Sequence, residues 1–129
     1  MEDETLIEAE YEDPVPMYAN SVRFEMTLWD LRLFFGQLLP QNAPTAPDVS
    51  WHTDITVPWV QAKLMHFFLG VNLAIHEAEN GRIKIPATAL PPAVASPPPE
   101  VDANNAQAMA MFQLVQKLIA DFREAEGKG

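Results

Sequence analysis

Apolar and polar residues alternate from residue 21 to residue 28, which predicts a β-strand with one buried face. The apolar side of this strand holds Val22, Phe24, Met26 and Leu28. The alternation returns from residue 31 to residue 35, with Leu31, Leu33 and Phe35 on one side. Because only a short interval separates the two segments, we expect an antiparallel hairpin.

The turn of this hairpin is expected at Trp29 and Asp30. That position pairs Phe24 with Phe35 and keeps the apolar residues of both strands on one face. Trp-Asp is not a favoured two-residue turn, so we expect the side chains of Thr27 and Asp30 to support a slightly longer turn with hydrogen bonds.

A third strand is predicted from residue 49 to residue 57. One side of it carries Val49, Trp51, Thr53, Ile55 and Val57. The other side carries Ser50, His52, Asp54 and Thr56. Pro58 ends the strand, because proline cannot continue a hydrogen-bonded ladder.

A long helix is predicted from residue 58 to residue 80, because proline suits the first helical position and Asn80–Gly81 is a good C-terminal stop. Its core-facing stripe consists of Val60, Leu64, Phe67, Phe68, Val71, Ala74, Ile75 and Ala78. A neighbouring stripe of Met65, Leu69 and Leu73 makes the apolar arc wider than one three-stranded sheet requires. Gly70 inside the helix predicts the close approach of another group.

Residues 86–101 form a proline-rich spacer, with six of the chain's twelve prolines between Pro86 and Pro99. A C-terminal helix follows, from Asp102 as its N-cap to Ala125. Its apolar stripe holds Met111, Val115, Leu118, Phe122 and Ala125. Before the spacer, residues 81–86 alternate briefly and suggest a short edge strand.

These elements predict an α+β fold, in which an antiparallel hairpin and a third strand pack on one long helix. The predicted organisation is an acidic arm at 1–17, a β-β-β-α core domain at 18–85, the spacer at 86–101 and the C-terminal helix at 102–129. The first thirteen residues hold seven of the eighteen acidic residues and neither Lys nor Arg, which predicts a disordered or loosely docked arm.

Charge and composition narrow the classes of partner. The net charge is −10, so nucleic acid is not an expected partner. The chain has no cysteine and no segment of the length that spans a bilayer, which makes the reducing cytoplasm the expected compartment and excludes thiolate chemistry.

The apolar surface of the predicted helix that the sheet does not cover predicts self-association, because a domain this small rarely buries enough surface alone. We therefore expect a dimer or higher homo-oligomer, with another protein as a further possible partner. The alternative is that the C-terminal helix folds back through the spacer and completes the core of a monomer. Phe34 faces away from Leu33 and Phe35, where a large ring suits an interface. The expected interface residues are Phe34, Met65, Leu69, Leu73, Met111, Val115, Leu118 and Phe122.

Three short motifs carry a resemblance to a known family. They are Tyr18-Ala19-Asn20 before the first strand, Asp30-Leu31-Arg32-Leu33-Phe34-Phe35-Gly36 in the second, and Thr56-Val57-Pro58 between strand and helix. The set resembles a bacterial domain-of-unknown-function family of short proteins, over about residues 18–85. The resemblance implies no catalytic residue or cofactor, and it implies that the Phe-Gly and Asn positions serve strands and turns.

Candidate chemistry is sparse. His52 and Asp54 share one strand face, but side chains two residues apart on a strand project in parallel and do not converge as a nucleophile and its base must. His66 and His76 are too far apart around the helix to share a metal ion. We expect a non-catalytic interaction or assembly module without a cofactor or metal. Two alternatives are a holdase for apolar segments, by a loose similarity to SecB-type export chaperones, and an enzyme with a site between subunits that uses His52, Asp54 and His66.

Overall fold

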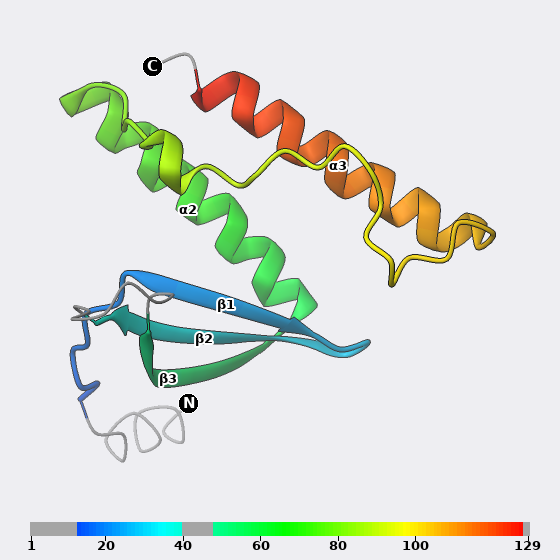
Figure 1. Ribbon diagram of the computed structural model, residues 1–129. Coiled ribbons are helices and arrows are strands. Elements are labelled where there is room, and N and C mark those ends of the chain that lie inside the picture. Colours follow the sequence, from blue (N-terminus) through cyan, green and yellow to red (C-terminus); the bar gives the residue numbers. More distant parts are fainter. Residues whose placement is uncertain (1–12, 40–47, 128–129) are drawn as a thin grey trace. The chain divides into compact units, whose positions relative to one another are not determined.

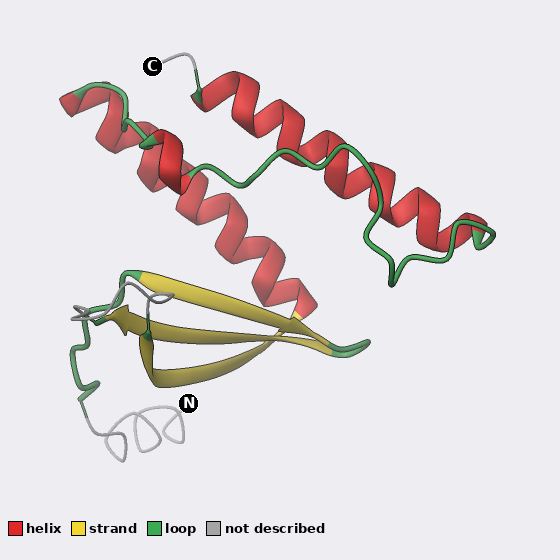
Figure 2. Cartoon of the chain, viewed as in Figure 1, coloured by secondary structure: helices red, strands yellow, loops and turns green. Residues whose placement is uncertain are grey.

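The computed structural model describes residues 13–39 and 48–127, which form a three-stranded sheet and two long helices (Figures 1 and 2). The elements are β1 (Ser21–Met26), β2 (Asp30–Leu38), β3 (Val49–Pro58), α2 (Trp59–Asn80), the 3-10 turn η1 (Ala87–Ala89) and α3 (Ala106–Glu126). The predicted α+β fold is confirmed. The predicted acidic arm lies outside the described residues, except for 13–17, which form neither helix nor strand.

The sheet is antiparallel throughout, with β2 between β1 and β3 (Figure 1). The predicted hairpin register is wrong by two residues, because Phe24 pairs with Leu33 and Met26 with Leu31. A shift of two residues leaves every side chain on its predicted face, since side chains alternate with a period of two. The apolar face of the hairpin is therefore the expected one.

Thr27 sets the observed register. Its backbone N–H donates to the carbonyl of Asp30 at 2.9 Å, which closes the hairpin around Leu28 and Trp29. The Thr27 hydroxyl oxygen accepts from the N–H groups of Trp29 and Asp30 at 3.1 and 3.0 Å, and the hydroxyl donates to Asp30 Oδ1 at 2.8 Å. The side-chain support expected from Thr27 and Asp30 is confirmed. These hydrogen bonds stabilise the turn although its residues are not ones that favour turn dihedral angles.

A β-bulge interrupts β3. Phe35 pairs with Thr53 but Gly36 pairs with Trp51, so His52 is an extra residue in β3. The bulge moves Trp51 and Val49 to the face opposite Thr53, which corrects the prediction that the odd-numbered residues share one side. A Cβ atom at Gly36 would lie 2.8 Å from the Ser50 carbonyl oxygen and 2.8 Å from the Trp51 ring, so the close approach of β3 at the bulge requires glycine.

Hydrogen bonds join the region of the bulge to residues 18–20, which precede β1. The His52 Nε2 atom lies 2.9 Å from the Tyr18 carbonyl oxygen, and Asn20 Oδ1 accepts from the Leu38 N–H at 2.8 Å. The Asn20 N–H donates to the Gly36 carbonyl at 3.1 Å. Tyr18, Asn20 and Gly36 therefore join the start of β1 to the distal end of the hairpin.

Helix α2 follows β3 directly, with Pro58 as the last strand residue and not the first helical one. The Trp59 indole N–H donates to the Thr27 carbonyl at 3.1 Å, which ties the start of α2 to the hairpin turn. The helix ends at Asn80 as predicted, and Gly81 adopts φ 90° while its N–H donates to the Glu77 carbonyl at 2.9 Å.

The chain divides into two compact units, residues 1–71 and 72–129, with the boundary inside α2. In the second unit, residues 81–86 form no strand, which corrects the prediction of an edge strand there. The Ile83 N–H donates to the Glu77 carboxylate at 2.9 Å, so a side chain takes the place of a ladder partner. Helix α3 starts later than predicted, because Asn105 is its N-cap and accepts from the Ala108 N–H at 3.1 Å.

Candidate interaction surface

The apolar face of the sheet is formed by all three strands. It consists of Val22, Phe24, Met26, Leu31, Leu33, Phe35, Ile55 and Val57. Leu33, at its centre, is 5% exposed and is the single buried hydrophobic residue among those the structure describes. Phe24 is 55% exposed and Met26 is 74% exposed, although both are on the face that should enter a core. Burial therefore decreases from β2 toward the β1 edge.

Helix α2 is apolar on two opposite sides. Leu69 follows Val60 by nine residues, which at about 100° per residue places it half a turn away around the helix axis. Met65, Leu69 and Leu73 are therefore opposite the first stripe and not beside it, which corrects the predicted arc. Phe67 on the first side is 60% exposed and Leu69 on the second is 62% exposed. No residue of α2 is buried in the described chain.

Gly70 has open space where a Cβ would be placed, because no described atom beyond its chain neighbours and the adjacent helix backbone lies within 4 Å. The close approach predicted at this position is therefore absent within the described chain. A helix with large apolar side chains on opposite sides is typical of a helix enclosed between two layers. The sheet of one chain can provide one such layer.

Phe34 lies on the other face of the sheet, within a cluster of charged side chains. Its ring is stacked by two guanidinium groups, with the Arg23 and Arg32 Cζ atoms 4.3 and 4.5 Å from the ring centroid. Arg23 also lies 5.3 Å from the Trp51 ring, which the bulge has moved to this face. Phe34 is half-buried by these contacts within its own chain.

Arg32 and Asp54 form a bidentate ion pair across β2 and β3. Arg32 Nε donates to Asp54 Oδ1 and Oδ2 at 2.9 and 3.0 Å, and the Arg32 Nη2 group also donates to Asp54. These hydrogen bonds lower the pKa of Asp54 and raise the pKa of Arg32. Asp54 is thus occupied as a structural partner of Arg32.

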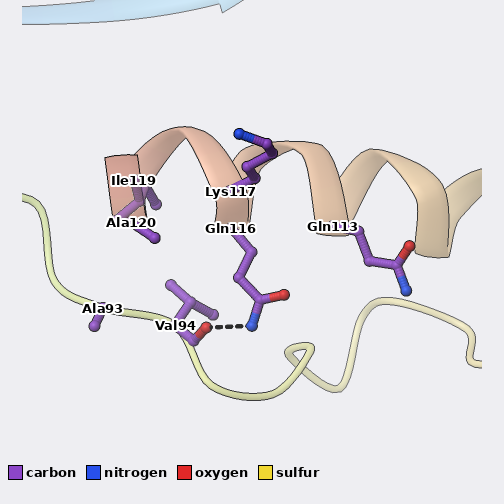
Figure 3. A pocket seen from close by; sticks show the side chains of 7 residues that line it. All are labelled: Ala93, Val94, Gln113, Gln116, Lys117, Ile119 and Ala120. Carbon is purple, nitrogen blue, oxygen red and sulfur yellow. Dashed lines mark hydrogen bonds between the residues drawn. The ribbon is translucent and has the colours of Figure 1, made fainter. Parts of the chain in front are cut away.

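Helix α3 presents one covered and one exposed side. The Gln116 side chain donates to the Val94 carbonyl at 2.7 Å, and Arg123 donates to the Pro91 carbonyl at 2.8 Å, so the spacer runs along α3 (Figure 3). A shallow cavity of about 360 Å³ lies between spacer and helix. Its lining consists of Ala93, Val94, Gln113, Gln116, Lys117, Ile119 and Ala120.

The predicted interface residues fall in three separate places. Met65, Leu69 and Leu73 share the second side of α2, and they are 37%, 62% and 45% exposed. The α3 residues share one exposed stripe, and they are Met111, Val115, Leu118 and Phe122. Phe34 stands apart on the charged face of the sheet. The exposed β1 residues Val22, Phe24 and Met26 were missed, because their alternation indicated a buried face.

The candidate chemical residues are not assembled into a site. His52 contacts Tyr18 and Thr53, with its Nδ1 atom 2.7 Å from the Thr53 hydroxyl. Asp54 pairs with Arg32, and His66 is exposed on α2. Within residues 13–39 and 48–127, no group of three His, Asp or Glu side chains is placed to hold a metal ion.

No protein-family model, curated protein or solved structure matches the chain. Neither of the two helices in the described ranges is both long and apolar enough to cross a membrane.

Proposed function

We propose that this protein is a non-catalytic assembly module that acts as a homo-oligomer in the cytoplasm. The observation that carries the proposal is the two-sided apolar character of α2. Val60 and Leu69 lie on opposite sides of the helix, and they are 75% and 62% exposed. Complete burial of one such side chain contributes about 1.5–3 kcal/mol before the cost of association is subtracted, which supports a second copy that covers one side of α2.

The non-catalytic part of the proposal has separate support. Two of the three polar residues that an intersubunit enzyme would use have structural partners in the chain, since His52 contacts Tyr18 and Asp54 pairs with Arg32. The absence of cysteine from the sequence agrees with a reducing compartment. The excess of acidic over basic residues agrees with a protein partner and not with nucleic acid.

Light scattering after size-exclusion chromatography tests the proposal. The full chain should elute with a mass that is a multiple of 14.4 kDa at micromolar concentration. Replacing Leu69 and Leu73 with Glu together should weaken association at least tenfold, because two apolar contacts become buried charges.

Lys63→Glu is the matched control, because it adds a carboxylate on a polar position of the same helix and should keep the wild-type mass. Far-UV circular dichroism establishes that each variant is folded, and Leu69→Ala replaces the double variant if that one unfolds. A wild-type chain that elutes as a 14.4 kDa monomer would refute the proposal.

A further inference from the structure

The free edge of β1 has unpaired backbone groups. In an antiparallel pair, residues that exchange hydrogen bonds alternate with residues that do not. The Thr27 N–H bonds to Asp30, so Glu25 and Arg23 are the next residues that bond to β2. Val22, Phe24 and Met26 therefore direct their N–H and C=O groups away from the sheet. No hydrogen bond joins these groups to another part of the described chain.

The other edge of the sheet is protected. The bulge at His52 interrupts the regular spacing of β3, and Pro58 at its end has no N–H to donate. Such features are the usual means of blocking strand addition. Residues 22–26 of β1 contain no proline, glycine or bulge, and their apolar side chains are 48–74% exposed. The β1 edge is thus the one that is open to strand addition.

Charge selects the partner and the register. Two copies of β1 can pair antiparallel only in registers that bring the outward residues opposite one another, and these registers differ by steps of two residues. One register places Arg23 opposite its own copy, and another places Glu25 opposite its own copy. The register between them places Arg23 of each strand opposite Glu25 of the other. It also places Phe24 opposite Phe24 and Val22 opposite Met26 on the apolar face.

We propose that two copies of this chain join through antiparallel pairing of β1 with β1, with Phe24 on the two-fold axis and Arg23 opposite Glu25. The pairing creates a six-stranded sheet whose apolar face is continuous across both chains. Opposite residues in such a pair have Cβ atoms about 4.5–5.5 Å apart, within reach of an ion pair between Arg and Glu. This inference rests on the proposed homo-oligomer and specifies one of its interfaces.

A charge-exchange experiment tests the register. Arg23→Glu alone and Glu25→Arg alone each place two like-charged pairs across the interface, so each should weaken self-association by about tenfold. An equimolar mixture of the two variants should form heterodimers in preference to homodimers by native mass spectrometry, because every facing pair is then attractive. The double exchange within one chain should restore the wild-type affinity.

A crosslinking measurement reads the same interface without changing its charge. Phe24→Cys places two thiols on the two-fold axis at a Cα separation of about 5.5 Å, which a disulfide can bridge, and the sequence contains no other cysteine. Ile55→Cys, on β3 of the same face, is the control and should remain uncrosslinked under the same oxidant.

The outcomes separate this inference from the proposed function. The β1 interface is overturned if the wild type is oligomeric, the mixture of the two charge variants shows no preference for heterodimers, and position 24 crosslinks no faster than position 55. The proposed homo-oligomer would still stand in that case. A monomeric wild-type chain would overturn both.

Discussion

Gly36→Ala should destabilise the fold, because β3 lies directly where the new methyl group would be placed. The added Cβ would be 2.7 Å from Val49 Cγ1 and 2.8 Å from both the Ser50 carbonyl oxygen and Trp51 Cε3. The Val49 methyl and the Trp51 ring can rotate, but the Ser50 carbonyl belongs to the strand backbone and cannot move without disturbing the β2–β3 ladder. Overpacking of this kind costs about 1–3 kcal/mol.

Urea unfolding followed by tryptophan fluorescence measures this cost. For a typical small domain, the expected loss lowers the unfolding midpoint by about 1 M. All variants are compared at one protein concentration, because unfolding of an oligomer depends on concentration. Gly70→Ala is the matched control, since it adds the same methyl group where nothing beyond the adjacent helix backbone and the chain neighbours lies within 4 Å in the described chain.

The two glycine variants should shift in opposite directions. Gly70→Ala should raise stability by about 1 kcal/mol, because alanine is the better helix former and the site is open. A Gly36→Ala protein with a midpoint equal to or above that of the wild type would show that β3 can retreat from β2 at the bulge. The steric argument for glycine at this position would then be wrong.

Two further substitutions test the polar contacts of the sheet. Thr27→Val should cost about 1–2 kcal/mol through the lost hydrogen bonds of the turn, whereas Thr56→Val on the exposed face of β3 should change the urea midpoint little. Because the pKa of Asp54 is lowered in the folded chain, its pairing with Arg32 stabilises the fold above the unfolded value of 3.8 and is lost as pH falls through the folded value. Asp54→Asn should therefore be less stable than the wild type at pH 7 and equal to it in strong acid, and a constant difference at all pH values would contradict this explanation.

The sequence predicted the type of the three observed strands and the two long helices well, because a period of two or of 3.6 residues is a local property. The brief alternation at 81–86 was too short to predict reliably, and no strand forms there. The sequence predicted the faces of the hairpin correctly and the register incorrectly. The cause is Thr27, because its hydroxyl forms the hydrogen bonds that place the turn at Leu28 and Trp29. Apolar alternation does not encode these hydrogen bonds. The bulge at His52 escaped prediction for a similar reason, since residues 49–57 alternate without a break and only pairing with Gly36 reveals the extra residue.

The candidate surface was predicted in part. Periodicity identified the two stripes of α2, but treating them as neighbours concealed that they are opposite. The position of a helix end was ambiguous where several residues could act as the cap, as with Asp102 and Asn105 before α3. Asp102 accepts from the Asn104 N–H at 2.9 Å in the preceding turn, so it serves a turn and leaves the helix to Asn105. The exposure of β1 depends on the whole fold, and no local pattern reports it.

The two-sided character of α2 has a consequence for the supply of the protein in the cell. In the proposed assembly, a newly made copy cannot bury both apolar sides of α2 until it binds another copy, so its survival depends on how much of the protein is already present. Dilution would act as a denaturant, and orphaned copies would be the preferred targets of proteases. The abundance of the protein would then show a threshold, below which synthesis yields little lasting product.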